Sequence, residues 1–132
     1  MIPIKFRAWD KRRQRMIEVT SINFRNGTIE EDTRYAVNRQ IYLDDIVLMQ
    51  YTNLTDKNGA EIYEGDTLTL KYPRDRRYTV TAKVIRGSQI SAMTLKFEDE
   101  FTTEEIPLYK ISAEHNFEVI GNIYEGQELL EE

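Results

Sequence analysis

The chain has 132 residues, 40% hydrophobic and 31% charged, a composition typical of one ordinary globular unit and too apolar for a disordered chain. It contains no cysteine, which excludes disulfides and thiolate metal sites, and no apolar run long enough for a signal peptide or a membrane span, so we expect a cytoplasmic protein. The net charge of −5 is uneven, because residues 1–40 carry nine basic and five acidic side chains whereas residues 98–132 carry one basic and eleven acidic.

The first predicted element is a strand over residues 4–9, where Ile4, Phe6 and Ala8 alternate with Lys5, Arg7 and Trp9. This alternation predicts a buried face and a basic outer face. The next six residues, 10–15, are too polar to be buried and predict a hairpin loop leading to a second strand over residues 16–20. Four of the six are basic, so the loop is either simply solvated or able to hold a phosphate backbone or an acidic partner.

The middle of the N-terminal half is less regular. Asn26-Gly27 predicts a turn, and the acidic residues 30–32 predict a surface run. The period over Arg34 to Leu43 fits either strand or short helix, and we leave this choice open. The apolar run over residues 46–51 predicts a buried strand.

The stretch from Met49 to Asp66 contains the clearest turn signal of the chain. Asn58-Gly59 tolerates the positive φ of a tight reversal, and Leu54 and Ile62 give each arm an apolar residue to bury. Gly65-Asp66 then begins a strand over residues 67–72 in which apolar and polar residues alternate.

Beyond residue 72 the pattern predicts short strands with tight turns. Pro73 ends the preceding strand because proline cannot donate to a ladder. Residues 78–85 and 89–97 alternate about Gly87-Ser88 as a hairpin, and residues 106–111 and 117–123 predict two further strands. Five short strands after residue 60 are typical of a small barrel.

Three sequence blocks, residues 5–10 (KFRAWD), 49–66 and 117–125 (FEVIGNIYE), together resemble the YopX family of bacteriophage and prophage proteins. They occur in the family's order and span almost the whole chain. The resemblance implies a phage-encoded protein acting in a bacterial host, a β-rich fold ending in an SH3-like barrel, and a molecular function that the family leaves unassigned. It supplies no catalytic residue.

Catalytic chemistry finds little support in this sequence. His115 is the single histidine, and without cysteine it would need carboxylates alone to complete a metal site or a triad. The chain has no P-loop, dinucleotide-binding or nucleophile-elbow motif. We therefore expect no enzyme activity, no cofactor and no metal site.

Two binding hypotheses remain. The first is a non-catalytic protein-interaction or assembly module that binds a host or phage protein, or itself, through a strand edge and exposed aromatic anchors, which are Trp9, Tyr51, Tyr63 and Tyr124. The alternative is a nucleic-acid-binding accessory factor that uses a basic loop with interleaved aromatics. The residues of that loop are Lys71, Tyr72, Arg74, Arg76, Arg77 and Tyr78. Pairing of these arginines with the acidic residues 98–105 would remove its main support.

The sequence thus predicts a mainly β protein, with a β-rich α+β fold as the alternative. We expect an N-terminal β-hairpin region over residues 1–60 packed on an SH3-like barrel over residues 61–126, followed by an acidic tail at residues 127–132. The identity of the partner, the stage of a phage cycle and the oligomeric state have no signal in the sequence.

Overall fold

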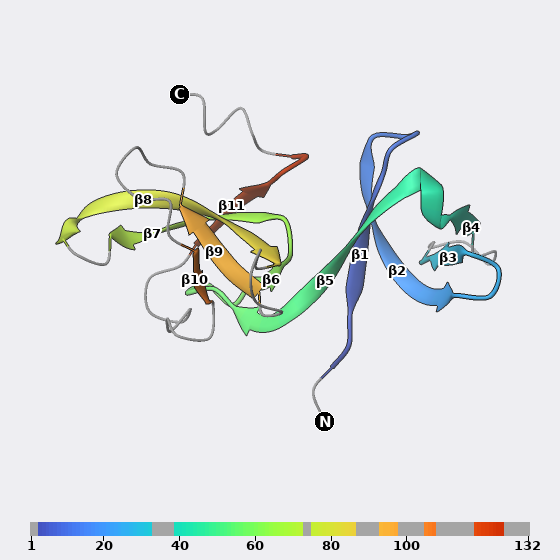
Figure 1. Cartoon of the computed structure of the whole chain (residues 1–132), viewed down its shortest axis with the longest axis horizontal. Coiled ribbons are helices and arrows are strands. Elements are labelled where there is room, and N and C mark those ends of the chain that lie inside the picture. The colour runs from blue at the N-terminus through green and yellow to red at the C-terminus, as the bar shows by residue number, and fades with distance from the viewer. Residues whose placement is uncertain are drawn as a thin grey trace. The chain divides into compact units, whose positions relative to one another are not determined.

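The computed structural model describes residues 3–32, 39–72, 75–86, 93–97, 105–107 and 118–125. Within them the chain forms strands and one short 3-10 helix (Figure 1), so the predicted mainly β class is confirmed. The contacts group the chain into two compact units, Met1–Tyr51 and Thr52–Glu132. The division falls inside one strand, β5 (Ile46–Thr55). The predicted domain limits at residues 60 and 126 stay predictions.

The N-terminal unit is one antiparallel sheet in the order β4-β3-β2-β1-β5. Besides the first part of β5, its elements are β1 (Phe6–Asp10), β2 (Arg15–Asn23), β3 (Thr28–Glu31), β4 (Arg39–Tyr42) and the 3-10 helix η1 (Leu43–Asp45). Residues 39–42 are therefore strand, and residues 34–38 of the ambiguous segment lie outside the described part. The core of this unit consists of Ala8, Ile17, Ile29, Ile41 and Ile46.

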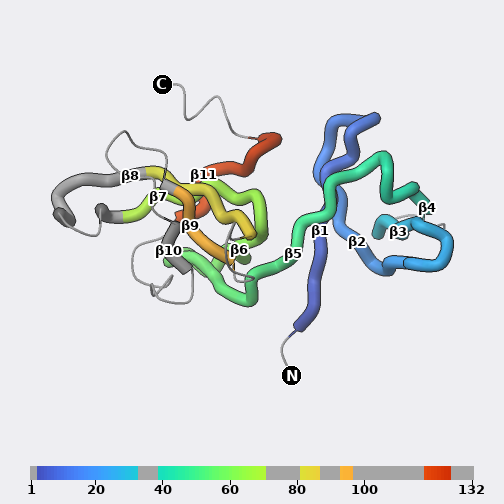
Figure 2. Tube along the Cα trace, in the orientation of Figure 1, coloured from blue at the N-terminus to red at the C-terminus, as the bar shows by residue number. Residues whose placement is uncertain are grey.

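The position of β1 corrects one expectation from the sequence. It pairs with β2 on one side and with β5 on the other, so it is a central strand (Figure 2). Ala8 and Asp10 are completely buried, and Trp9, on the predicted outer face, is only 6% exposed. Alternation along a strand separates two faces, but it does not say whether the second face is also covered.

The C-terminal unit contains the end of β5 and a five-stranded antiparallel sheet in the order β10-β9-β8-β7-β11. Its strands are β6 (Glu61–Tyr63), β7 (Asp66–Tyr72), β8 (Asp75–Arg86), β9 (Met93–Phe97), β10 (Glu105–Pro107) and β11 (Glu118–Asn122). Ile62 of β6 joins the core formed by Leu68, Leu70, Ala82, Val84 and Leu95. Among the described residues β10 and β11 end an open sheet, so closure into an SH3-like barrel stays a prediction.

The turn at Asn58-Gly59 forms as predicted, and Asp56 organises it. Gly59 adopts φ 83°, a left-handed conformation that glycine accepts without strain. The Asp56 carboxylate accepts hydrogen bonds from the backbone N–H of Asn58 at 2.8 Å and of Ala60 at 2.9 Å. Its second oxygen accepts one from the N–H of Val119 in β11 at 3.0 Å. One buried carboxylate thus joins the hairpin to the last strand of the same unit.

Candidate functional site

The aromatic residues predicted as partner anchors are less accessible than expected. Trp9 is 6% exposed and Tyr51 is 8% exposed, while Tyr63 and Tyr124 are half-buried. The Lys5 ammonium lies 5.5 Å from the centre of the Tyr51 ring, within cation–π range. The predicted exposure of Trp9 and Tyr51 is therefore not observed, and a partner role for the four aromatics stays a prediction.

The basic segment predicted as a nucleic-acid site forms strands where a loop was expected. Lys71 and Tyr72 end β7, whereas Arg76, Arg77 and Tyr78 belong to β8. β8 begins at Asp75, which is the partner of Tyr72 in the β7–β8 register. The expected break at Pro73 lies outside the described residues. The side chains of this hairpin, Arg74, residues 98–104 and His115 lie outside the described part. The nucleic-acid hypothesis for this segment stays a prediction.

The structure draws attention instead to the basic turn between β1 and β2, which Asp10 organises. One Asp10 oxygen accepts hydrogen bonds from the N–H groups of Arg12 at 3.0 Å and Arg13 at 3.1 Å. The other pairs with the Arg13 guanidinium at 3.3 Å. Burial acts to raise the pKa of Asp10, but these hydrogen bonds outweigh it and hold that pKa below its ordinary value. The turn therefore holds its arginines around an ionised carboxylate.

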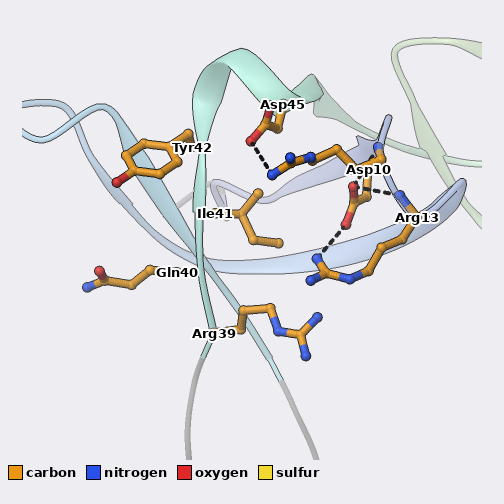
Figure 3. A pocket seen from close by; sticks show the side chains of 8 residues that line it. Asp10, Arg13, Arg39, Gln40, Ile41, Tyr42 and Asp45 are labelled. Carbon is orange, nitrogen blue, oxygen red and sulfur yellow. Dashed lines mark hydrogen bonds and ion pairs between the residues drawn. The ribbon is translucent and has the colours of Figure 1, made fainter.

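This turn forms one wall of a cavity of about 330 Å³ in the N-terminal unit, which we call the arginine cleft (Figure 3). Its lining residues are Asp10, Arg12, Arg13, Arg39, Gln40, Ile41, Tyr42 and Asp45. Lys11 N–H donates to the Asp45 carbonyl at 3.0 Å and so ties the turn to η1. The cleft contains three arginines and two aspartates, and it lies where β4 approaches the β1–β2 turn.

The three arginines differ in how far they are already neutralised. Arg13 is paired with Asp10, and the Arg12 guanidinium lies 3.8 Å from Asp45 with its side chain 77% exposed. Arg39 is exposed and has no ion pair with any residue of the described part. Its guanidinium lies on the same side of β4 as Arg13 (Figure 3). Arg39 is therefore the cleft cation that is most available to an added anion.

A second ion pair explains why Arg39 lacks a carboxylate. Glu31 lies directly opposite Arg39 in the β3–β4 register. Both Glu31 oxygens are engaged by the Arg15 guanidinium, with Nη2 donating to Oε2 at 2.7 Å, and this hydrogen bond raises the pKa of Arg15. Glu31 is only 5% exposed, so the prediction that residues 30–32 all lie at the surface is wrong for Glu31. The nearest acid on the neighbouring strand is thus already paired.

The arrangement is suited to holding an anion. Guanidinium groups bind carboxylate and phosphate oxygens in a planar, two-point geometry. Within the described residues, no group of three or more potential metal ligands lies together. The described part also contains no helix with the length and apolarity needed to cross a bilayer.

Sequence reasoning missed most of this cleft. It identified the basic turn at residues 10–15 but left residues 34–43 without a secondary structure, so it did not bring Arg39 to the turn. Ile4, predicted on the buried face of the first strand, is 79% exposed, and the exposed Phe24 and Tyr42 of the described part were not singled out. Tyr42 follows buried Ile41 in β4, and strand alternation over residues 39–42 would have indicated its outward direction.

The sequence model of the YopX protein family matches residues 5–131. The chain belongs to the YopX family. A solved structure described as protein EF1440 from Enterococcus faecalis is similar to this YopX protein, with a TM-score of 0.64 and 27% sequence identity over 98% of this chain and 99% of that chain. No curated protein matches the chain.

The blocks that suggested the YopX family have structural roles. In the last block, the buried Asn122 side chain accepts hydrogen bonds from the N–H groups of Tyr124 and Glu125, each at 2.8 Å. In the middle block, Asp66 accepts from the N–H of Tyr63 at 2.8 Å, and Gly65 adopts φ 92°. These blocks therefore specify turns of the YopX fold, and the arginine cleft draws on only the end of the first block.

Proposed function

We propose that this YopX protein is a non-catalytic interaction or assembly module, encoded by a phage or prophage, that binds an acidic segment of a protein partner in the arginine cleft. The observation behind this proposal is the exposed Arg39 guanidinium, which faces the Asp10-bound Arg13 across the cleft while Glu31 is occupied by Arg15. An incoming carboxylate would find a cation that no described carboxylate neutralises.

Charge supports a local site for anions in an acidic protein. The whole chain has a net charge of −5, but residues 1–51 carry nine basic and seven acidic side chains. A strongly acidic probe is repelled by the chain as a whole, so its binding reports a local basic region and not the average surface. The attraction is modest because the cleft is open to solvent, where a single ion pair contributes about 0.2–1 kcal/mol.

The proposal is tested by fluorescence anisotropy with the purified full chain and a labelled hexaglutamate peptide at low ionic strength. Arg39→Gln should weaken binding about threefold, consistent with one exposed charge-assisted contact. The matched control is Arg25→Gln, which removes another exposed arginine of the same unit but one outside the cleft. Hexalysine, which the net charge of −5 attracts, should bind the unmodified chain and Arg39→Gln to the same extent.

Two results would count against this function. Equal weakening by Arg25→Gln and Arg39→Gln would show that only overall charge matters. Tighter binding of an oligonucleotide of matched charge, lost on changing Arg76 and Arg77 to Gln but kept in Arg39→Gln, would favour the nucleic-acid hypothesis for the β7–β8 hairpin. The acidity of the whole chain and Asp75 within the basic segment count against it, so we place it second.

A further inference from the structure

β4 is the outermost strand of its sheet. The order β4-β3-β2-β1-β5-β6 places β3 on one side of it, and no strand of the described part pairs with the other side. An edge strand presents a row of backbone N–H and C=O groups that another chain can pair with. β4 is short, at four residues, and it forms part of the arginine cleft.

The register shows which backbone groups of β4 point outward. The N–H of Leu43, directly after β4, donates to the carbonyl of Gly27 at 2.9 Å, and Tyr42 is opposite Thr28. In an antiparallel ladder, successive residues alternate between bonding the neighbouring strand and pointing away from it. Ile41, like Leu43, therefore bonds toward β3, whereas the backbone groups of Gln40 and the N–H of Tyr42 point to the unpaired edge.

The side chains of β4 alternate in the perpendicular direction. Arg39 and Ile41 project to the side that carries Asp10 and Arg13, whereas Gln40 and Tyr42 project to the opposite side (Figure 3). Tyr42 is 66% exposed, and tyrosine is one of the residue types favoured at protein interfaces. The edge thus offers cations on one face and an exposed aromatic ring on the other.

We infer that the partner segment binds as an added β-strand along β4. Its backbone pairs with Gln40 and Tyr42, its acidic side chains alternate into the arginine cleft, and the intervening apolar side chains pack beside Tyr42. Strand addition obtains affinity from main-chain hydrogen bonds and specificity from alternate side chains. This inference rests on the proposed function, since the cleft arginines supply the charge complementarity that selects an acidic occupant.

The test uses the ¹⁵N-labelled full chain and a synthetic peptide that alternates glutamate and valine over about nine residues, a length adequate for one strand. Amide hydrogen exchange at Gln40 and Tyr42 should slow at least about tenfold when the peptide is bound, because outward N–H groups acquire acceptors. The Ile41 amide, directed toward β3, should change much less and serves as the internal control.

A pair of variants separates the backbone contribution from the side chain. Gln40→Ala and Gln40→Pro both remove the amide side chain, but only proline removes the outward N–H, at an edge position where proline is tolerated. Gln40→Pro should weaken peptide binding about fivefold relative to Gln40→Ala, as expected for one lost hydrogen bond. The ¹⁵N spectrum of each variant shows whether the β3–β4 pairing is retained.

The outcomes distinguish the two proposals. Binding that needs Arg39 but is equal in Gln40→Ala and Gln40→Pro, with no added protection at Gln40 and Tyr42, would overturn strand addition and leave the acidic-segment function standing. Binding that does not depend on Arg39 would overturn the proposed function itself. Protection of both amides without peptide, increasing with protein concentration, would show that a second copy occupies the edge and would overturn the acidic partner strand.

Discussion

Replacing Asp56 by alanine tests how much one buried carboxylate stabilises the C-terminal unit. Asp56 is 4% exposed and accepts N–H hydrogen bonds from Asn58, Ala60 and Val119. Hydrogen bonds to a charged acceptor contribute about 1.5–3 kcal/mol each, and an unsatisfied buried donor costs a similar amount. Because Asn58 and Ala60 are exposed, water can replace the carboxylate for them, which leaves the Val119 contact as the main loss.

We therefore expect Asp56→Ala to lower the free energy of unfolding of the C-terminal unit by about 3 kcal/mol. Asp56→Asn keeps one acceptor oxygen but directs its amide N–H toward a backbone N–H. It should therefore lower the free energy of unfolding by about 2 kcal/mol. Urea unfolding followed by NMR signals of residues in β7 and β8 measures both changes, and amide exchange at Val119 reports the broken contact directly.

The matched control is Lys57→Ala at the neighbouring position. Lys57 pairs with Glu118 at 3.4 Å, but both side chains are nearly half exposed, and surface pairs of this kind contribute little. The urea unfolding transition of Lys57→Ala should stay close to that of the unmodified chain. A loss below about 1 kcal/mol for Asp56→Ala, or equal losses at both positions, would refute the assignment of a stabilising role to the Asp56 carboxylate.

Two further predictions concern acid stability and the core. At both Asp10 and Asp56, burial raises the pKa, but backbone hydrogen bonds lower it more, so the folded-state pKa lies below the ordinary value. The stability that these two carboxylates contribute is fully present above their unfolded-state pKa of about 3.9. It is lost as the pH falls through their lower folded-state pKa. In urea titrations the free energy of unfolding of the unmodified chain should fall below about pH 4, and that of Asp56→Asn should fall less. Parallel plots of unfolding free energy against pH for the two proteins would contradict this expectation. Leu68→Ala, at a fully buried site, should cost about 3 kcal/mol in the same assay, and a cost below 1 kcal/mol would mean that Leu68 is not a packed core residue.

Local turn chemistry was predictable because it depends on a few adjacent residues. Asn58-Gly59 and Asn26-Gly27 both form turns, with Gly59 at φ 83° and Gly27 at φ 67°. The alternating patterns after residue 66 likewise predicted paired strands, which appear as β7, β8 and β9. In these segments local preference and the final pairing agree, so sequence alone was sufficient.

The arginine cleft was not predictable because it depends on which distant segments become neighbours. Periodicity divided β1 into two faces but could not show that β2 and β5 cover both of its edges and that Trp9 is buried. Nor could it show that Glu31 would be bound by Arg15 and so leave Arg39 without that carboxylate. Charge counts identified the basic residues 10–15 but could not show which charges neutralise one another.

The place of β11 in the C-terminal sheet has a consequence for synthesis on the ribosome. Among the described strands β11 comes last in the sequence, yet it pairs with β7, which precedes β8, β9 and β10. Until residue 118 emerges, the nascent chain presents the open edge of β7, on which Leu68 and Leu70 are apolar, to other chains. Premature termination shortly before β11 would therefore release a product prone to aggregation, so a soluble pool of this protein depends on synthesis continuing through β11.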